Sequence, residues 1–476
     1  MMDSVEVRRG TYHDSVRLMQ VSRALQEAQG VKEALVAMAT DLNRELLSGM
    51  GFDLKAIGAT GSNDLILALR AVDEQAVDQA RRALEEALVT KARPDFGMLA
   101  APIAHVVGSA AAQATIALIS VPGEYAFVEA MDALSHGLDV MVFSDNVPIA
   151  KEIVLKEIAG RRGLLVMGPD CGTAIVNGVG LGFANVVQLG PVGIVGAAGT
   201  GIQQLCCLLD EAGVGVRHAL GTGSRDLSIE VGGSSTLRGL AALDRDPSTE
   251  VLIVVSKPPS PEVAARVRAA AQECTTPTVL AYLGEEGVTL EGAAHQALEL
   301  LGKAPTVYAS WPAARGDHRP GVLRGFFSGG SLANEAARLA ASALGEISRD
   351  EQASGHTIVD YGEDEYTRGR AHPMIDQRLR LQRLEAMVGD PHVGVILLDV
   401  VLGHGAHPDP ATELAPVIAR ATAGRAAVVV SLCGTKGDPQ DRDRQARLLG
   451  EAGASVWLSN AAAARHAISL VDGGGR

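Results

Sequence analysis

Aromatic side chains, cysteines, surplus basic residues and long apolar runs are all scarce or missing in this sequence of 476 residues. Its 42 lysines and arginines are outnumbered by 56 aspartates and glutamates, which gives a net charge of −14. Such a chain offers no basic stripe that could neutralise the phosphates along a nucleic acid, so we expect no nucleic-acid partner. A small anionic substrate needs only local donors and stays compatible with this balance.

Membrane and export signals are missing as well. No stretch reaches the roughly 18 uncharged apolar residues that a membrane helix needs, so we expect no membrane partner. The first ten residues are charged and no apolar run follows them, which argues against a signal peptide. We therefore expect a cytoplasmic protein.

The five cysteines form no C-x-x-C pair. Their count is odd and most of them lie in apolar stretches, which is typical of buried, reduced thiols. Cys171 differs, because it lies in a polar turn. No spacing of His, Cys and Asp resembles a metal site, so no metal is predicted.

What the sequence does contain is glycine, at 54 residues, and a regular alternation of two kinds of segment. Short apolar runs are typical of strands that are covered on both faces, and lie at Val140–Ser144, Gly163–Met167, Val192–Val195, Val251–Val255, Thr278–Tyr282, Val393–Asp399 and Ala426–Leu432. Segments with helical spacing alternate with them, at Tyr125–Ser135, Ile202–Ala212, Pro261–Gln272, Leu332–Ala341, Ala411–Ala421 and Asp441–Gly450. This alternation predicts an α/β fold with parallel sheets.

The chain length predicts about three domains. Lys303–Gly321 is rich in Pro, Ala, Arg and Gly and is predicted to contain a linker. The first 110 residues are less regular, with predicted strands at Val5–Arg8, Leu35–Ala39 and Leu65–Arg70, helices at Ser15–Gln29 and Glu74–Leu88, and a loop at Pro94–Ala114. We expect an N-terminal α/β region at 1–110, domains at 111–188, 189–305 and 321–476, and the linker at 306–320.

Two glycine-rich turns, each between a predicted strand and a predicted helix, are the most informative feature. The first contains Gly199, Thr200 and Gly201, and the second contains Gly329, Gly330 and Ser331. Glycine lets a ligand approach the backbone, and the helix start behind each turn offers unpaired N–H groups with partial positive charge. Together these predict phosphate-binding sites, although a tight strand–helix turn without a ligand would show the same residues. Neither turn is a dinucleotide fingerprint or a P-loop.

Further polar residues follow predicted strands in the front part of the chain. Asp170 and Cys171, in the turn Met167–Thr173, lie where open α/β sheets bind substrates; a rigid turn capped by Asp170 is the alternative. Arg225 is suited to clamp a carboxylate or phosphate. Lys257, at the end of a strand, is a candidate for neutralising an oxyanion, or a solvated charge.

One loop of the back part concentrates charge. It contains Arg368, Arg370, His372 and Asp376, a density that suits a doubly charged anion. We predict that the two arginines bind a substrate carboxylate and that His372 is catalytic. A solvated loop with a local Arg–Asp pair is the alternative.

These motifs resemble succinyl-CoA synthetase. The run from Gly163-Leu-Leu-Val-Met-Gly-Pro-Asp-Cys171 to Gly193-Ile-Val-Gly-Ala-Ala-Gly-Thr200 is similar to its α subunit, and the part from Phe327-Ser-Gly-Gly-Ser331 onward is similar to the C-terminal ligase domain of its β subunit. The resemblance implies a Rossmann-like CoA-binding-type domain followed by two flavodoxin-like domains with parallel sheets. It also implies that the two glycine turns face each other across a phosphohistidine loop.

The sequence departs from that family at chemically important positions. Leu283-Gly-Glu-Glu-Gly287 stands where a phosphohistidine loop is expected, and Lys257 stands where the histidine-pairing glutamate is expected. The ATP-grasp domain has no counterpart, and Gly10-Thr-Tyr-His13 only hints at the CoA-binding glycine loop. A lysine in place of the glutamate favours a free anion over a histidine.

Several long blocks resemble the FdrA family of acyl-CoA-synthetase-like proteins over nearly the whole chain. They include Phe143-Ser-Asp-Asn-Val147, Val166-Met-Gly-Pro-Asp-Cys-Gly-Thr173, Ser256-Lys-Pro-Pro259 and Gly369-Arg-Ala-His-Pro-Met-Ile-Asp376. This resemblance implies a component of a multi-subunit oxamate carbamoyltransferase in allantoin breakdown, which interconverts oxalurate plus phosphate with oxamate plus carbamoyl phosphate.

Three hypotheses follow. In the first, the chain transfers an acyl or carbamoyl group through an acyl phosphate: the glycine turns hold the phosphoryl group, Lys257 and Arg225 assist, and Arg368 or Arg370 binds the substrate. In the second, it is a CoA ligase subunit that uses the nucleotide site of a partner chain. In the third, it is a non-catalytic metabolite-binding subunit. Phosphate or an acyl phosphate is the expected ligand, CoA is a further candidate, and other subunits of a hetero-oligomeric complex are the expected partners.

Overall fold

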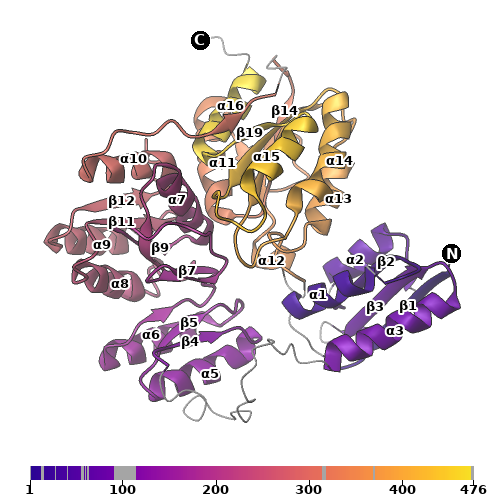
Figure 1. The fold of residues 1–476 in the computed structure, drawn as a ribbon, viewed down its shortest axis with the longest axis horizontal. Coiled ribbons are helices and arrows are strands. Elements are labelled where there is room, and N and C mark those ends of the chain that lie inside the picture. Colours follow the sequence, from indigo (N-terminus) through magenta and orange to yellow (C-terminus); the bar gives the residue numbers. More distant parts are fainter. Residues whose placement is uncertain are drawn as a thin grey trace. The chain divides into compact units, whose positions relative to one another are not determined.

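The computed structural model describes residues 2–11, 15–26, 28–39, 41–54, 58, 60–61, 64–89, 114–313, 318–367 and 370–472. The chain divides into two compact units (Figure 1). One comprises Met1–Ile103 and Glu363–Leu379, and the other comprises Ala104–Gly362 and Arg380–Arg476.

The first unit contains an antiparallel sheet with helices. The strand order is β1-β3-β2, formed by β1 (Met2–Arg8), β2 (Val31–Met38) and β3 (Leu65–Ala71). The helices are α1 (Ser15–Gln26), α2 (Asp41–Gly49), α3 (Glu74–Val89) and the short α12 (Asp364–Thr367). Alternate residues of β2 enter two separate cores: Val36 packs in the cluster that contains Leu25, while Leu35 packs in the cluster that contains Leu47. Both faces of the strand are therefore covered, which explains its continuous apolar run.

The second unit opens with a small parallel sheet. Its strands lie in the order β4-β5-β6 and are β4 (Ile116–Ile119), β5 (Asp139–Val142) and β6 (Val166–Met167). Two helices connect them, α5 (Gly123–Ser135) and α6 (Ile149–Arg162). The α6 helix ends at Gly163, whose φ of 72° is the left-handed conformation that favours glycine after a helix.

A six-stranded sheet follows, in the order β12-β11-β9-β10-β7-β8. Its strands are β7 (Thr173–Val176), β8 (Val179–Gly182), β9 (Val192–Ala197), β10 (Val216–Gly221), β11 (Val251–Ser256) and β12 (Thr278–Tyr282). Its helices are α7 (Gly199–Glu211), α8 (Ser234–Asp244), α9 (Pro261–Glu273) and α10 (Leu290–Leu300). The four strands β12, β11, β9 and β10 are parallel, and the hairpin β7–β8 joins β10 in antiparallel register.

The back part of the chain forms a seven-stranded sheet in the order β13-β19-β18-β17-β14-β16-β15. Its strands are β13 (Ser310–Trp311), β14 (Val322–Phe327), β15 (Ile347–Ser348), β16 (His356–Asp360), β17 (Val393–Val401), β18 (Ala427–Cys433) and β19 (Ser455–Trp457). The helices are α11 (Gly330–Leu344), α13 (Arg378–Ala386), α14 (Pro410–Ala423), α15 (Arg442–Glu451) and α16 (Asn460–Asp472). Every pair is parallel except β13 with β19.

The predicted α/β class with parallel sheets is confirmed, and three details differ from expectation. The hairpin β7–β8 lies within 111–188 but pairs with β10 of the next sheet. The predicted linker contains β13, whose two residues pair with β19 at the sheet edge. The segment Glu363–Leu379 belongs with the N-terminal region rather than with the rest of 321–476. The predicted loop at 94–114 lies almost wholly outside the described residues, as do residues 12–14 of the hinted glycine loop.

No helix among the residues described is long and apolar enough to cross a membrane.

Candidate functional site

The first glycine turn joins β9 to α7 at a place where backbone and side chains pack closely. A methyl group on Gly196 would lie 2.6 Å from Val255 Cγ1, so only glycine fits beside β11. The helix then starts at Gly199, and its N-cap residue, Ala198, provides no side-chain hydrogen bond. The first-turn N–H groups are therefore not capped by that residue. Thr200 is nearly buried, with 9% of its surface exposed.

The second glycine turn joins β14 to α11, and a carboxylate of the protein occupies part of it. Asp399 Oδ1 accepts hydrogen bonds from Ser328 N at 2.8 Å and Ser328 Oγ at 2.9 Å, and its Oδ2 accepts from Gly329 N at 2.8 Å. Arg380 Nη1 donates to Asp399 Oδ1 at 2.5 Å. Asp399 thus binds the turn as a free anion would, and Arg380 balances its charge.

The two turns meet. Thr200 Oγ1 accepts a hydrogen bond from Ser331 N at 3.3 Å, and a methyl group on Gly201 would lie 3.4 Å from Ser331 Cβ. A methyl group on Gly329 would lie 2.7 Å from Thr200 Cγ2. The structure therefore brings the predicted phosphate-binding residues of both turns together at facing helix N-termini. Their binding of phosphate stays a prediction.

Lys257 reaches this junction from the end of β11. A methyl group on Gly330 would lie 2.5 Å from Lys257 Nζ and would also collide with Asp360 Oδ2. The ammonium and the carboxylate therefore flank one point at the first residue of α11. The helix N-terminus adds partial positive charge there, which favours an anionic group.

Asp360 is a residue that the sequence reasoning missed. It ends β16, and its Oδ1 accepts a hydrogen bond from Gly362 N at 2.9 Å. The signal was the short run Thr357-Ile-Val-Asp360, an apolar pair followed by a carboxylate at a strand end. Strand ends at this edge of a parallel sheet carry ligand-binding residues.

Arg225 belongs to a buried ionic network instead of the glycine turns. Its Nε donates to Glu152 Oε2 at 3.0 Å, and its Nη2 donates to the Val147 carbonyl at 2.8 Å. Lys156 Nζ donates to Glu152 Oε1 at 2.8 Å and to Asp226 Oδ1 at 2.7 Å. The two cations balance the two carboxylates, so the predicted catalytic role of Arg225 finds no support in its surroundings.

Asp170 and Cys171 lie in a constrained turn after β6. Asp170 adopts a φ of 56°, and Cys171 is 2% exposed. The thiol donates to the Gly221 carbonyl at 3.2 Å, and burial raises its pKa to about 12. A buried, protonated thiol is a poor nucleophile, and the substrate contact of Cys171 stays a prediction.

The charged loop of the back part falls in the other unit. Arg370 Nε donates to Asn43 Oδ1 at 2.9 Å, and the His372 ring accepts a hydrogen bond from Met374 N at 3.2 Å. Arg368 lies outside the described residues. Lys257 and both glycine turns belong to the unit that comprises Ala104–Gly362 and Arg380–Arg476, whereas Arg370 and His372 belong to the first unit. The predicted catalytic set is therefore divided between two units.

Metal ligands do not cluster among the residues that the structure describes: no group of three or more His, Cys, Asp or Glu could hold an ion.

Two separate segments of the chain match known families. Residues 1–99 match the family described as "AllF, heavy metal-associated domain", and residues 326–470 match the CoA-ligase family. Residues 1–99 contain no cysteine. The CoA-ligase match begins near the end of β14 and includes the second glycine turn.

Similarity to one relative extends over nearly the whole chain. "Uncharacterized protein YahF" of Escherichia coli (strain K12) is 36% identical over 97% of both chains. The α subunit of the ADP-forming succinate–CoA ligase of Methanothermobacter thermautotrophicus is 27% identical over 29% of this chain and 47% of that subunit. Among solved structures, the dinucleotide-forming acetyl-coenzyme A synthetase 1 of Ca. Korarchaeum cryptofilum, in complex with phosphate and ADP, is 14% identical over 77% of this chain and 84% of that one, with a TM-score of 0.33.

Proposed function

The chain belongs to the same family as YahF of Escherichia coli, and we propose that it is an acyl-CoA-synthetase-type subunit that reacts an acyl phosphate with coenzyme A. The observation that supports this best is the junction of the two glycine turns with Lys257 beside it. The match of the second turn's domain to the CoA-ligase family supports the same reaction class. We expect other subunits to complete the enzyme.

The reaction we propose needs no nucleotide at this site. The thiol of coenzyme A attacks the carbonyl carbon of the acyl phosphate, so a carbon–sulfur bond forms and the carbon–oxygen bond to phosphate breaks. The thiol proton leaves with the phosphate. The facing helix starts at Gly199–Gly201 and Gly330–Ser331, together with Lys257, stabilise the negative charge that accumulates on the departing phosphate. Asp360 flanks the same point of the junction as Lys257.

A second candidate is carbamoyl transfer, the activity that the resemblance to the FdrA family implies. The observation that favours it is the loop after β12, Leu283–Gly287, which has no histidine to carry a phosphoryl group. Here a phosphate oxygen attacks the carbamoyl carbon of oxalurate, the carbon–nitrogen bond breaks, and oxamate leaves with the phosphate proton. The product, carbamoyl phosphate, is again an acyl phosphate.

One experiment separates these candidates. The full chain is purified with the proteins that accompany it, and phosphate release is followed without nucleotide from acetyl phosphate with coenzyme A, and from carbamoyl phosphate with oxamate. Thioester absorbance with the first pair supports the ligase-type reaction, whereas oxalurate formation with the second supports carbamoyl transfer. Phosphate release from neither pair would overturn both.

A further inference from the structure

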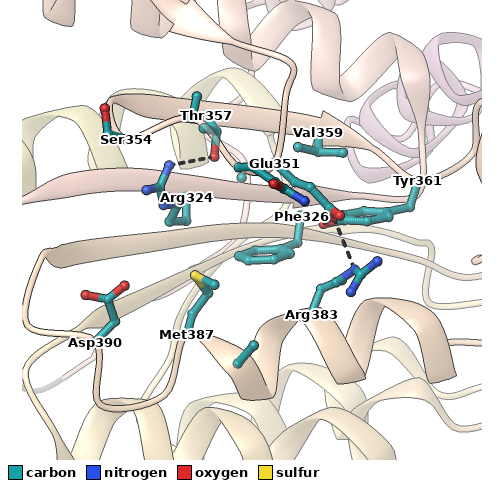
Figure 2. A pocket seen from close by; sticks show the side chains of 14 residues that line it. Arg324, Phe326, Glu351, Ser354, Thr357, Val359, Tyr361, Arg383, Met387 and Asp390 are labelled. Carbon is teal, nitrogen blue, oxygen red and sulfur yellow. Dashed lines mark hydrogen bonds and ion pairs between the residues drawn. The ribbon is translucent and has the colours of Figure 1, made fainter. Parts of the chain in front are cut away.

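A cavity of about 360 Å³ opens in the back part of the chain, between β14, β16, α13 and the loop 349–355 (Figure 2). It shares none of its lining residues with the two glycine turns. Its volume is at the lower end of the range for small-molecule sites. A ligand in this cavity would therefore bind at a different place from the acyl phosphate of the proposed reaction.

The floor of the cavity is apolar. Phe326 and Val359 contribute it from the sheet and Met387 from the turn after α13 (Figure 2). The rings of Phe326 and Tyr361 lie nearly parallel, with centroids 6.1 Å apart and an interplanar angle of 2°. Such a floor favours a compact apolar or aromatic group.

At one end lies Arg324, which forms no ion pair among the described residues, although the charge of Asp390 acts on it. Its Nη1 donates to the Gly355 carbonyl at 2.7 Å and to Thr357 Oγ1 at 3.2 Å. Its Nε is buried without a hydrogen-bond partner, and no carboxylate among the described residues forms an ion pair with it. Burial lowers the pKa of Arg324, and the charge of Asp390 opposes this shift. The guanidinium lines the cavity, so an anionic group there could still pair with its charge.

At the opposite end of the cavity, an arginine and a glutamate already form an ion pair. Arg383 Nε lies 3.2 Å from Glu351 Oε2, and the same oxygen accepts a hydrogen bond from Tyr361 OH at 3.0 Å. Asp390 also lines the cavity and opposes excess negative charge. The cavity is thus lined by two arginines and two carboxylates, a balance that disfavours the double negative charge of a phosphate group.

We propose that this cavity is a binding site for a small monocarboxylic acid, whose carboxylate pairs with Arg324 and whose apolar body lies against Phe326 and Met387. Beyond Arg324 the cavity continues into a hollow of about 540 Å³ that Arg425, His392 and Asp390 line. The proposal does not depend on the reaction at the glycine turns, so either can fail without the other.

The test is a calorimetric titration of the full chain with benzoate and with hexanoate, alongside benzamide and phenyl phosphate. We expect at least one carboxylate to bind at millimolar concentration, and both neutral benzamide and phenyl phosphate to bind more weakly. Arg324→Gln should weaken the carboxylate by about tenfold or more, because a charge-assisted pair is lost. Ser354→Trp, which places a large side chain at the exposed rim, should also weaken it, whereas Arg447→Gln, an exposed arginine on α15, should not.

The outcomes decide the proposal in either direction. Binding that needs both the carboxylate and Arg324 establishes the site. Failure of both carboxylates to bind, equal binding by Arg324→Gln, or tighter binding of benzamide would overturn it. Tighter binding of phenyl phosphate would overturn the assignment to a monocarboxylate.

Discussion

The chemistry proposed for this protein depends on where single atoms lie around Gly330. Lys257 Nζ and Asp360 Oδ2 both approach the place that a side chain at this residue would fill. Sequence reasoning identified Lys257, because a charged residue directly after an apolar run is visible in one chain. It missed Asp360, since the strand before it is short and its neighbour across the junction is more than a hundred residues away.

Gly330→Ala tests this geometry with one methyl group. The new Cβ forces Lys257 Nζ away from the helix start, so we expect kcat/KM for acyl-phosphate consumption to fall roughly tenfold to a hundredfold. The fold should persist, because residue 330 needs no left-handed backbone. Gly450→Ala is the matched control: it places a methyl group in open space on α15 and should leave the kinetics unchanged. Wild-type kinetics in Gly330→Ala would show that the contact is irrelevant.

The thiol of Cys171 gives a prediction about reactivity. With a pKa of about 12, only about one Cys171 in ten thousand is a thiolate at pH 8, and the residue is also buried. We expect iodoacetamide to leave Cys171 unmodified in the native protein and to modify it after unfolding, as peptide mass spectrometry would show. Cys274, the cysteine that is partly exposed, should react first. Rapid native labelling of Cys171 would restore it as a candidate for substrate contact.

At the scale of elements, sequence patterns predict the long apolar strands well and the short ones poorly. The prediction for β12 has the same bounds as the structure, Thr278–Tyr282, since its run is continuous and ends in polar residues. Helix α7 begins at Gly199 rather than Ile202, because its first turn is made of glycines that pattern analysis assigns to the loop. Strand β13 has only two residues, and its composition predicts a linker. It forms a strand because it pairs with β19 at the sheet edge.

The hairpin β7–β8 was readable in principle. Asn177 and Gly178 separate its strands, and both adopt a positive φ, at 49° and 78°. Asn-Gly between two β-branched runs is the strongest short-range hairpin signal. What no local signal shows is that this hairpin joins β10 of the next sheet.

The turn before α11 depends on one buried ion pair. Asp399 and Arg380 are 0% and 2% exposed, and Asp399 also holds the Ser328 and Gly329 amides. Asp399→Asn leaves the guanidinium without a buried counter-charge and should lower the free energy of unfolding by about 3–5 kcal/mol, measured by urea denaturation.

Two further variants make this result specific. Removing both charges, with Asp399→Asn and Arg380→Met together, should recover part of the loss, because no lone buried charge remains. Glu385→Gln breaks an exposed pair with Arg420 and should change stability little. If Asp399→Asn were as stable as the wild type, the turn would not depend on this carboxylate.

At the scale of the whole molecule, the six-stranded and seven-stranded sheets are joined through α10, α11 and α16. Glu335 on α11 accepts hydrogen bonds from Leu290 N at 2.7 Å and from Asn460 Nδ2 at 2.7 Å. Burial raises the pKa of this carboxyl group, and the two hydrogen bonds offset only part of the rise. The folded protein therefore holds the proton of Glu335 more tightly than the unfolded chain does.

The pH dependence of stability follows with a definite sign. A raised pKa in the folded state contributes stability below the ordinary value of 4.5, and this contribution is lost as the pH rises toward the folded pKa. Glu335→Gln cannot ionise, so its unfolding free energy should fall less steeply than that of the wild type as the pH rises above 4.5 in urea titrations. Glu299→Gln, an exposed carboxylate on α10, should retain the wild-type slope. Equal slopes in all three proteins would exclude Glu335 as a titrating group.

The molecule as a whole shows where sequence reasoning about the site reached its limit. Lys257 and the two glycine turns are far apart in the chain but come together in the structure. The resemblance to a known pair of domains had implied that the two turns face each other. Arg370 and His372 do not join them within one unit, since their segment packs with the N-terminal region. Charge density in a loop indicated a site but could not indicate which unit the loop belongs to.

The central claim is that Lys257 and the facing helix starts stabilise the phosphate that leaves an acyl phosphate. The most direct measurement is kcat/KM for nucleotide-free phosphate release from acetyl phosphate and from carbamoyl phosphate, in the complete enzyme, for wild type, Lys257→Ala and the exposed-lysine control Lys303→Ala. We expect kcat/KM of Lys257→Ala to fall by about a hundredfold, typical of losing one charge-stabilising donor, and kcat/KM of Lys303→Ala to stay unchanged. Lys257→Ala at the wild-type rate would contradict it.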